Sequence, residues 1–544
     1  MEALDMNTEL QNGQAITRRL AELLAIKDVS GKTQASVWEN IIVSGLATDS
    51  RKVNKGDLFF ALNGLTVDGR NYIAAAIKRG AVAVLAESAE AAETLTVRKQ
   101  LGVMVIDVPG LSKQLSAIAG RYYGDPSEDL TVIGVTGTNG KTSCSHLIAS
   151  LADSLGQQSG LLGTLGFGVF HNAGQHGDLE LQTTGFTTPD AVQLQACIKG
   201  LADKHCTLIA AEVSSHALAQ HRADAIGFDV AVLTNLSHDH LDFHKDMASY
   251  ADAKRRLFYL NNVSAAVINA DDNFGAQLAT ELKSESPADF DRDLRVFTYS
   301  TQAVDASLPE TQQPDIYVRN THYALNKIVA DVITPWGGGV INIPLIGEFN
   351  LSNALAALTA MLATGADFKA LLDVFPQVPA VKGRMEIVSD SNGDSLSNKT
   401  VVVDYAHTPQ ALELALKALR PHTEQRLWCV FGCGGDRDQD KRAAMGRIAR
   451  ALADNIIITS DNPRSEPPEQ IIDDILLGID DMHNVNVEQD RAAAIAFAVA
   501  QAQAGDLLLI AGKGHEQFQI IGDMQLPFSD VDVVRKNLLA ESQQ

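Results

Sequence analysis

The sequence predicts a three-domain α/β protein, and three observations lead to this fold class. The chain has 544 residues, enough for three or four domains at about 150 residues each. Apolar, β-branched runs alternate with helical stretches, which is typical of parallel sheets covered by helices on both faces. Polar or glycine-rich turns directly follow many of these runs. We place the domains at residues 1–128, 129–381 and 382–544.

The predicted elements alternate in the same way within each domain. Helices are expected at 72–79 and 144–155, and the polar region at 280–339 is expected to hold insertions and edge strands. Apolar runs predict strands at 57–62, 81–86 and 103–108 in the first domain, at 130–135, 207–211, 229–233 and 264–269 in the second, and at 401–404, 427–431, 455–459 and 506–511 in the third. The third domain therefore has a doubly wound pattern.

Composition and charge exclude several classes of protein. The 44 basic and 67 acidic residues give a formal net charge of −23, which argues against non-specific binding to nucleic acid or to an anionic membrane. The five cysteines are odd in number and scattered, so no disulfide framework is predicted. The first 50 residues lack an apolar secretory core, and no run has the length of a membrane span. We expect a cytoplasmic protein.

A phosphate-binding loop is predicted at the start of the second domain. The sequence TGTNGKT at 136–142 follows an apolar strand and precedes a helix. Backbone N–H groups of such a turn, together with the helix N-terminus, bind phosphate. Lys141 is expected to reach the β- and γ-phosphates, and Thr142 to place its hydroxyl on Mg2+. Val135 stands where the common motif has its first glycine, so a tight turn with a surface lysine is the less favoured alternative.

Two further clusters belong to the same domain. Glu212 ends an apolar strand, where ligands gather in open parallel sheets, and its carboxylate can hold Mg2+. His238, His240 and His244 lie within seven residues, together with two aspartates. Their H-x-H-x3-H spacing matches no common zinc signature, so zinc is a minority alternative. We prefer His240 as a ligand of a second Mg2+, with His238 or His244 in a structural role.

Four polar loops directly follow predicted strands of the third domain. They lie at 403–409, 431–438, 461–464 and 511–516. Because the carboxyl ends of parallel strands meet at one edge, the loops outline one site that faces the phosphate loop across a domain cleft. Arg437 and Arg464 can each bind a carboxylate there, and Glu516 can bind an ammonium. For any single loop, turn formation alone is the alternative.

These motifs have companions elsewhere in the chain. The set comprises DSR at 49–51, GDLFF at 56–60, TGTNGKT at 136–142, EVSSH at 212–216, TN at 234–235, DH at 239–240, GEFNLSN at 347–353, DYAHTP at 404–409 and DNPR at 461–464. Together they resemble the Mur ligases, which build the peptide stem of bacterial peptidoglycan, over nearly the whole chain. Within that family they resemble the MurE type, which adds the third stem residue to UDP-N-acetylmuramoyl-L-Ala-D-Glu. The arginine of DNPR accompanies meso-diaminopimelate, and lysine-adding members usually lack it.

The resemblance implies a small UDP-binding α/β domain, a central P-loop-like ATPase domain with a parallel sheet, and a Rossmann-like domain that binds the amino acid. Residues implied at ATP are Gly137, Thr138, Asn139, Gly140, Lys141, Thr142, Asn235, Asn350, Arg384 and, at the ribose, Asp404. Residues implied at the UDP-linked substrate are Thr48 and Ser50 at the uridine, and Thr187, Thr188, Ser214, Gln220 and Arg222 at the muramoyl dipeptide. Residues implied at diaminopimelate are Arg437, Asp461, Asn462, Arg464, Gly512 and Glu516.

The resemblance also identifies Lys254 as the family lysine that becomes carbamylated, a change that turns a cation into a carboxylate-like ligand for Mg2+. From its pattern alone, Lys254 reads as a solvated helix residue. The implied metal ligands are Thr142, Glu212, His240 and carbamylated Lys254, and the implied catalytic residues are Lys141, Glu212, His240 and Lys254. Ala443 departs from the family, which often has proline there, outside the expected chemistry.

The implied activity is that of an ATP-driven amide ligase. The γ-carboxylate of D-Glu attacks the γ-phosphate of ATP, and the diaminopimelate amine then displaces phosphate from the acyl phosphate. ATP and Mg2+ are the implied cofactors, the partners are the UDP-N-acetylmuramoyl dipeptide and meso-diaminopimelate, and the chain is expected to be a monomer. Alternatives are an L-lysine-adding ligase of the same type and a non-ligating, nucleotide-gated binding protein. Folylpolyglutamate synthetases share the phosphate loop, but the DSR segment at 49–51 argues against them.

Overall fold

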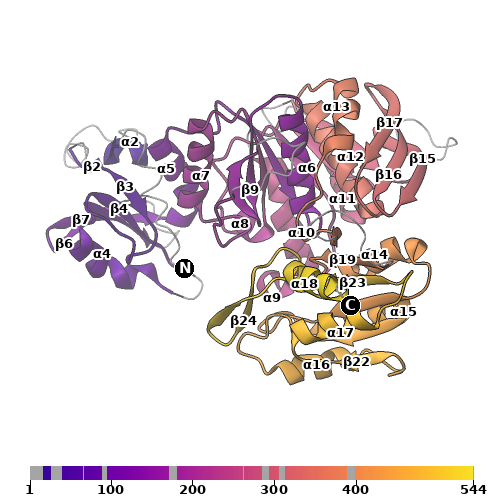
Figure 1. Ribbon diagram of the computed structural model, residues 1–544. Helices are drawn as coiled ribbons and strands as arrows, with labels where there is room; N and C mark the ends of the chain where they lie inside the picture. The colour runs from indigo at the N-terminus through magenta and orange to yellow at the C-terminus, as the bar shows by residue number, and fades with distance from the viewer. Residues whose placement is uncertain are drawn as a thin grey trace.

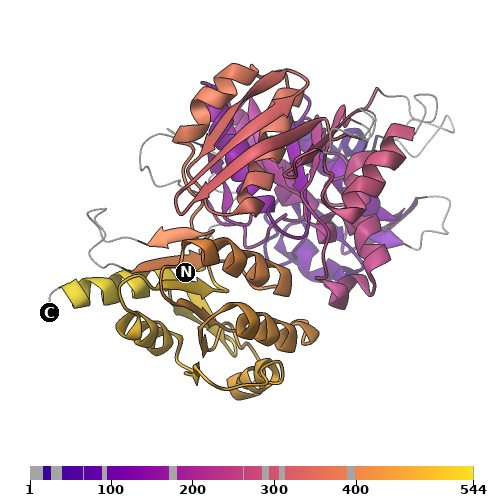
Figure 2. The same cartoon turned by 90° about the vertical axis from the view of Figure 1, so that its right-hand side faces the viewer.

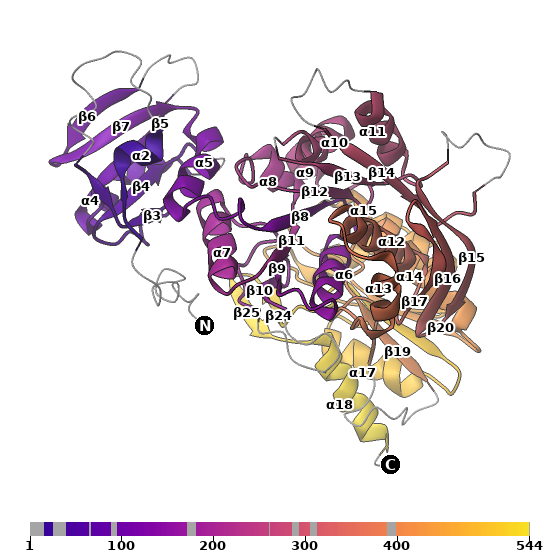
Figure 3. The same cartoon turned by 90° about the horizontal axis from the view of Figure 1, so that it is seen from above.

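The computed structural model describes residues 16–25, 40–64, 67–88, 95–170, 181–260, 262–284, 293–304, 313–388 and 399–542. Three lobes follow one another along the chain, each around a sheet of its own (Figure 1). The N-terminal lobe stands apart at one end, while the C-terminal lobe lies against the central one (Figure 3). The predicted α/β fold class with parallel sheets is confirmed. In these ranges, no helix has both the length and the apolar character needed to cross a membrane.

The N-terminal lobe contains a five-stranded sheet in the order β3-β4-β5-β7-β6. Strands β3, β4, β5 and β7 are parallel, and β6 pairs antiparallel with β7 at the edge. The elements are β1 (Arg18–Arg19), α2 (Leu20–Leu24), β2 (Ile42–Val43), β3 (Gly45–Ala47), β4 (Asp57–Ala61), α4 (Ile73–Arg79), β5 (Ala83–Ser88), β6 (Thr96–Gln100), β7 (Val103–Pro109) and α5 (Leu111–Tyr123). Every residue of β4 is buried, as its continuous apolar run predicts.

The central lobe contains a ten-stranded sheet in the order β10-β9-β11-β8-β12-β13-β14-β15-β16-β17. The strands from β9 to β15 in this order are parallel, and β10, β16 and β17 are antiparallel to their neighbours. The strands are β8 (Thr131–Thr136), β9 (Ser159–Gly163), β10 (Gly166–Val169), β11 (Leu208–Glu212), β12 (Val230–Leu233), β13 (Ala265–Asn269), β14 (Arg295–Ser300), β15 (Ile316–Ala324), β16 (Lys327–Thr334) and β17 (Gly337–Ile343).

Helices cover both faces of this sheet, as the continuous apolar strands predict. Ile133 and Val135 of β8 pack in one core, and Val132, directly before Ile133, packs in the other. The helices are α6 (Lys141–Ser154), α7 (Ala191–Asp203), α8 (Ser215–Ala219), α9 (Leu241–His244), α10 (Met247–Arg255), α11 (Asn273–Ser284), α12 (Glu348–Ala363) and α13 (Phe368–Val374).

The region at 280–339 contains the edge strands that are predicted for it. It supplies β14, β15, β16 and the start of β17, which extend the sheet to its edge. Strand β16 alternates buried and half-buried residues after its first position, and Asp331 interrupts its apolar sequence, so the strand is not a continuous apolar run.

The C-terminal lobe contains a six-stranded sheet in the order β18-β19-β23-β20-β21-β22, parallel except for β18. It lies below the extended end of the central sheet (Figure 2), and Leu325 in the β15–β16 turn packs on its core. The elements are β18 (Glu386–Val388), β19 (Thr400–Asp404), α14 (Pro409–Leu419), β20 (Leu427–Phe431), α15 (Asp440–Leu452), β21 (Asn455–Ile458), α16 (Pro468–Leu476), β22 (Val485–Val487), α17 (Arg491–Gln501), β23 (Leu507–Ala511), β24 (Phe518–Ile521), β25 (Met524–Pro527) and α18 (Asp530–Ser542).

Candidate active site

The predicted phosphate loop joins β8 to α6, in the expected order of strand, turn and helix. Its glycines have positive φ angles, 154° at Gly137 and 87° at Gly140. A Cβ atom at Gly137 would lie 1.8 Å from the Thr234 hydroxyl oxygen, and one at Gly140 would lie 2.4 Å from the Asn353 side-chain oxygen. The loop is therefore held between β12 and α12, where a side chain at either glycine would displace it.

The two side chains expected at phosphate and metal both lie at this loop. The Lys141 ammonium donates to the carbonyl oxygens of Gly137 and Thr138, each at 2.9 Å. Burial lowers the pKa of Lys141. Thr142 is buried, and its hydroxyl accepts a hydrogen bond of 3.3 Å from Arg384 of the C-terminal lobe. The phosphate loop therefore contacts the C-terminal lobe.

Glu212 ends β11 beside the loop, as predicted, and only 2% of its surface is exposed. One carboxylate oxygen accepts from the Thr164 backbone N–H at 2.9 Å, and the other from the Thr164 hydroxyl at 3.0 Å. Hydroxyl and carboxylate oxygens are the donors that Mg2+ prefers, with phosphate oxygens completing its shell. Thr142 and Glu212 line the same cavity, so their donor set fits a magnesium ion bound together with a nucleotide.

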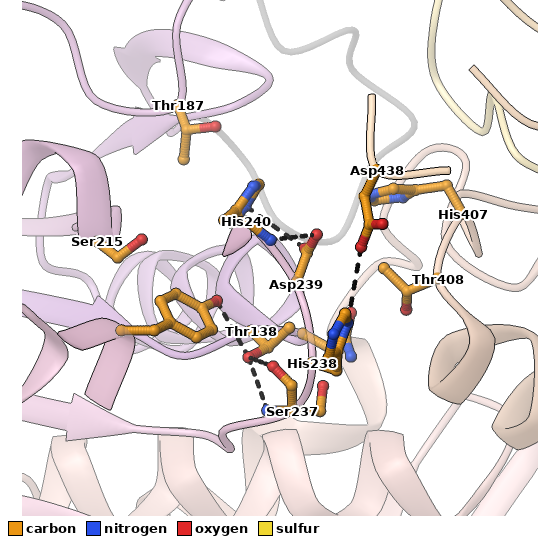
Figure 4. Close-up of polar contacts among 12 residues, drawn as sticks. Thr138, Thr187, Ser215, Ser237, His238, Asp239, His240, His407, Thr408 and Asp438 are labelled. Carbon is orange, nitrogen blue, oxygen red and sulfur yellow. Dashed lines mark hydrogen bonds and ion pairs between the residues drawn. The ribbon is translucent and has the colours of Figure 1, made fainter. Parts of the chain in front are cut away.

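The three histidines of the H-x-H-x3-H segment point to different partners. His238 lies 3.7 Å from the Asp438 carboxylate of the C-terminal lobe, whereas His240 lies 3.4 Å from Asp239 (Figure 4). His244 is hydrogen-bonded to the Ser215 hydroxyl at 2.9 Å. In the described ranges, no three His, Cys, Asp or Glu side chains form a group that can hold a metal ion, so the zinc alternative gains no support.

His240 occupies a left-handed position, with φ 55°, immediately before α9. Its ring lies 5.0 Å from that of His216, which lies 5.5 Å from that of His244. Burial lowers the pKa of each of His216, His240 and His244 to about 4. The imidazoles are therefore neutral near pH 7, the state in which a histidine can bind a metal ion.

Lys254 is almost fully buried, with 1% of its surface exposed. This contradicts the solvated position that its sequence pattern predicts. Its amine donates to the Gly137 carbonyl oxygen at 2.7 Å and lies 4.4 Å from the centre of the Tyr250 ring. Burial, followed by repulsion from Lys141, lowers the pKa of Lys254 well below its ordinary value. The neutral amine that carbamylation requires is favoured by this position.

Two cavities of about 450 and 580 Å³ lie between the central and C-terminal lobes. Lys141 and His240 line both, so the cavities meet there. The first also contains Thr138, Asn139, Gly140, Thr142, Glu212, Asn235, Arg384 and Asp404. The second also contains Thr187, Thr188, Ser214, Arg222, Lys254, Arg437, Asp461, Asn462, Arg464, Gly512 and Glu516. Residues predicted to bind ATP, the UDP-linked substrate and diaminopimelate therefore lie in two adjoining cavities.

Five predicted residues line neither cavity, and one of them is Gly137 of the phosphate loop. Thr48 and Ser50 belong to the N-terminal lobe, Ser50 at 9% exposure. Gln220 accepts two hydrogen bonds from Arg222 and so acts behind that side chain. Asn350 donates to the Ile346 carbonyl oxygen at 2.9 Å.

Asn353, rather than Asn350, lines the first cavity. It lines the first cavity beside Gly140, and its amide donates to the Asn350 side-chain oxygen at 3.3 Å. Both asparagines belong to the GEFNLSN motif and lie three residues apart in α12. Asn353 lines the cavity, and Asn350 supports it from behind. Sequence reasoning also missed Tyr405 and His407, which line both cavities, although DYAHTP contains them. The Arg384 guanidinium lies 4.2 Å from the Tyr405 ring centre.

Three family models match the chain. They are "Mur ligase family, catalytic domain" at residues 42–123, "Mur ligase middle domain" at residues 135–361 and "Mur ligase, glutamate ligase domain" at residues 383–514. A UDP-N-acetylmuramoyl-L-alanyl-D-glutamate--2,6-diaminopimelate ligase from Pseudomonas syringae pv. tomato is 45% identical over 499 residues, 92% of this chain and 96% of that protein. The ligase of the same name from Coxiella burnetii is 42% identical over 500 residues, again 92% and 96%.

Solved structures show the same architecture. A structure of a UDP-N-acetylmuramoyl-L-alanyl-D-glutamate--2,6-diaminopimelate ligase aligns with a TM-score of 0.66 at 36% identity, covering 96% of this chain and 99% of that one. A folylpolyglutamate synthase from Mycobacterium tuberculosis, complexed with ADP and AMPPCP, aligns with a TM-score of 0.57 at 19% identity over 78% of this chain and 95% of that one, a likeness of fold alone. The resemblance carried by the sequence motifs is confirmed, and the chain belongs to the Mur ligase family.

Proposed function

We propose that the chain is an ATP-dependent ligase that adds meso-diaminopimelate to the D-Glu γ-carboxylate of UDP-N-acetylmuramoyl-L-Ala-D-Glu. The observation that carries the proposal is the meeting of two cavities at Lys141 and His240, one containing the phosphate loop and the other the loop at 461–464. The activity in the names of relatives 42–45% identical over 92% of the chain supports it.

The proposed reaction has two steps. The substrate γ-carboxylate attacks the γ-phosphorus of ATP, the bond from that phosphorus to the ADP oxygen breaks, and an acyl phosphate forms. The neutral amine of the amino acid then attacks the acyl carbon, phosphate leaves, and the new amide nitrogen loses a proton. A carboxylate alone is a poor acylating agent, so the protein's main tasks are to position the groups and to neutralise charge.

The first cavity is the proposed site of phosphoryl transfer. Lys141, held at the loop by two carbonyl oxygens, would shift to the phosphates and neutralise the transferring group. Mg2+ held by Thr142 and Glu212, and a second ion at His240 and carbamylated Lys254, would neutralise phosphate and carboxylate charge when bound. The proposed nucleotide contacts are those already predicted, with Asn353 added and Asn350 behind it.

The second cavity is the proposed amino-acid site. Arg437 and Arg464 supply cations for the carboxylate at the distal end of diaminopimelate, and Asp461 and Glu516 supply carboxylates for its ammonium. Gly512 leaves space, because a Cβ atom there would lie 2.6 Å from an Asp461 carboxylate oxygen. L-Lysine lacks the distal carboxylate, so these arginines favour diaminopimelate.

The N-terminal domain, residues 1–128, is the proposed UDP site, with Thr48 and Ser50 at the uridine. Thr187, Thr188, Ser214 and Arg222 would contact the muramoyl dipeptide from the central domain, residues 129–381. Residues 382–544 form the amino-acid-binding domain. We propose that the chain acts as a monomer in the cytoplasm, where ATP is available.

Phosphate release from ATP tests the proposal. The wild-type chain is assayed with Mg2+ and UDP-N-acetylmuramoyl-L-Ala-D-Glu, with either meso-diaminopimelate or L-lysine, and the product is identified by mass spectrometry. We expect turnover and a tripeptide product with diaminopimelate, and Arg464→Ala should lower kcat/KM for diaminopimelate about 100-fold. A preference for L-lysine would mean that L-lysine, and not meso-diaminopimelate, is the amino-acid substrate. No ligation with either amino acid would favour the nucleotide-gated binding protein.

A further inference from the structure

Lys513 is a buried lysine behind the proposed amino-acid site. Its surface is 0% exposed, although it lies between Gly512 and Gly514 in an active-site loop. Both glycines have positive φ angles, 119° and 51°, and a Cβ atom at Gly514 would lie 2.6 Å from the Gly383 carbonyl oxygen. This close approach folds the loop tightly onto the domain while the lysine between the glycines points inward.

The Lys513 ammonium closes a ring of three hydrogen bonds. It donates to the Glu516 carboxylate oxygen Oε2 at 2.8 Å and to the Asn462 oxygen Oδ1 at 3.0 Å. The Asn462 amide nitrogen donates to the same Glu516 oxygen at 2.9 Å. Asn462 and Glu516 line the second cavity, and Lys513 does not. The lysine therefore holds two cavity side chains from behind.

The ring determines how each of these side chains faces the cavity. Asn462 Oδ1 also accepts from the Ile520 backbone N–H at 2.9 Å, so two donors prevent the amide from turning over. Glu516 uses Oε2 for both ring contacts, and in the described ranges Oε1 accepts no hydrogen bond from the protein. That second oxygen is left for an ammonium group of the ligand.

The charge of Lys513 affects which ligand the site prefers. An ion pair with Lys513 offsets part of the Glu516 charge, so an ammonium alone gains less at this site. Arg464 and Arg437 in the same cavity remain available for a carboxylate. A distal end that carries both an ammonium and a carboxylate is thereby favoured over one that carries an ammonium only.

We propose that Lys513 is a positioning residue that orients Asn462 and Glu516 and raises the selectivity of the site for an acceptor with a zwitterionic distal end. The proposal deepens the proposed function and rests on it. If Lys513 served stability alone, replacing it would destabilise the domain by breaking its pair with Glu516, but the preference of the site for one amino acid over another would not change. The selectivity of the site distinguishes the two roles.

Lys513→Met tests the proposal in the full-length chain, because it keeps the length of the side chain and removes its charge and donors. The ratio of kcat/KM for meso-diaminopimelate to that for L-lysine should fall about 10-fold or more. KM for ATP and for the UDP-linked substrate should stay within about twofold of wild type, because neither contacts the ring. Lys399→Met is the matched control, because Lys399 precedes the start of β19, at the end of the sheet away from the ring, and donates to the Val499 and Ala502 carbonyl oxygens; it should leave the ratio unchanged.

The outcomes separate this proposal from the proposed function. If the wild-type chain ligates neither amino acid, the proposed function fails and this inference fails with it. If the wild type ligates diaminopimelate and Lys513→Met keeps the wild-type ratio, or changes all three KM values together, the inference alone is overturned. Should Lys513→Met not fold, Lys513→Arg takes its place. The proposal is supported if Lys513→Arg keeps the wild-type ratio of kcat/KM values and raises the KM for diaminopimelate. It is overturned if that ratio falls to that of a non-selective site or if the KM for diaminopimelate is unchanged.

Discussion

The Lys254 amine lies 2.7 Å from the carbonyl oxygen of Gly137, so it contacts the phosphate loop directly. As an ammonium it would add a second buried cation beside Lys141, and that repulsion contributes to the lowered pKa. As a carbamate it would present carboxylate-like oxygens, which Mg2+ binds readily. The environment therefore favours the neutral, modifiable amine over the charged one.

Lys254→Arg should inactivate the enzyme, because arginine keeps the positive charge and cannot form this carbamate. We expect kcat/KM to fall about 100-fold or more, the scale of losing one electrostatic contact to the transition state. Labelling with 13C-bicarbonate should give a carbamate NMR signal in the wild type and none in the variant. Lys417→Arg, on an exposed face of α14, should change neither result. Wild-type activity in Lys254→Arg would remove the carbamate from the mechanism.

At the residue level, sequence reasoning worked where chemistry is local. The strand, the two glycines and Lys141-Thr142 are contiguous, so their geometry follows from a few adjacent peptide units. It failed at Lys254, whose burial depends on how α10 packs near the loop. Asn350 and Asn353 show the same limit, since which of the two reaches the cavity depends on the rotation of α12.

Among the helices, α17 and α18 are joined by a fully buried ion pair. Both the Arg491 and the Asp530 side chains are 0% exposed, and two contacts of 2.7 Å join them. Arg491 also donates to the Ala511 carbonyl oxygen at 2.9 Å, directly before Gly512. The pair thus ties the C-terminal helix to the strand end that carries the proposed amino-acid site.

Asp530→Asn should destabilise the C-terminal domain by about 3–5 kcal/mol, because it leaves the Arg491 charge buried without its partner. The double variant Arg491→Met with Asp530→Leu should lose much less, since it leaves no unpaired charge. Urea unfolding of the full chain measures both. Glu413→Ala, which removes an exposed pair with Lys417, should change stability by less than about 0.5 kcal/mol. Equal losses in the single and double variants would contradict this account.

For the whole molecule, the arrangement of lobes places the site between two of them. The first cavity takes residues from both the central and the C-terminal lobes. Asn139 and Gln410, which line it, form a hydrogen bond of 3.2 Å across the boundary, and the pair His238–Asp438 lies nearby. A nucleotide in this cavity would therefore bind both lobes at once, while the N-terminal lobe stands apart (Figure 3).

Thermal unfolding should show this linkage. A chain of three domains is expected to unfold in more than one transition. A non-hydrolysable ATP analogue with Mg2+ at about 100 times its Kd should stabilise the lobes that bind it by about 2.7 kcal/mol, a Tm increase of about 5 °C or more for domains of this size. Calorimetry should show the N-terminal transition unmoved. A shift of every transition by the same amount would contradict binding between these two lobes alone.

The sequence by itself determined the fold class, most parallel strands and the phosphate loop, because continuous apolar runs and a contiguous glycine turn are local patterns. Only the tertiary structure decided the burial of Lys254 and Lys513, which of Asn350 and Asn353 lines the cavity, and the order in which the strands within 280–339 extend the central sheet. Each of these depends on which distant segment packs against the residue. A lysine reads as solvated until the neighbours that bury and neutralise it are known.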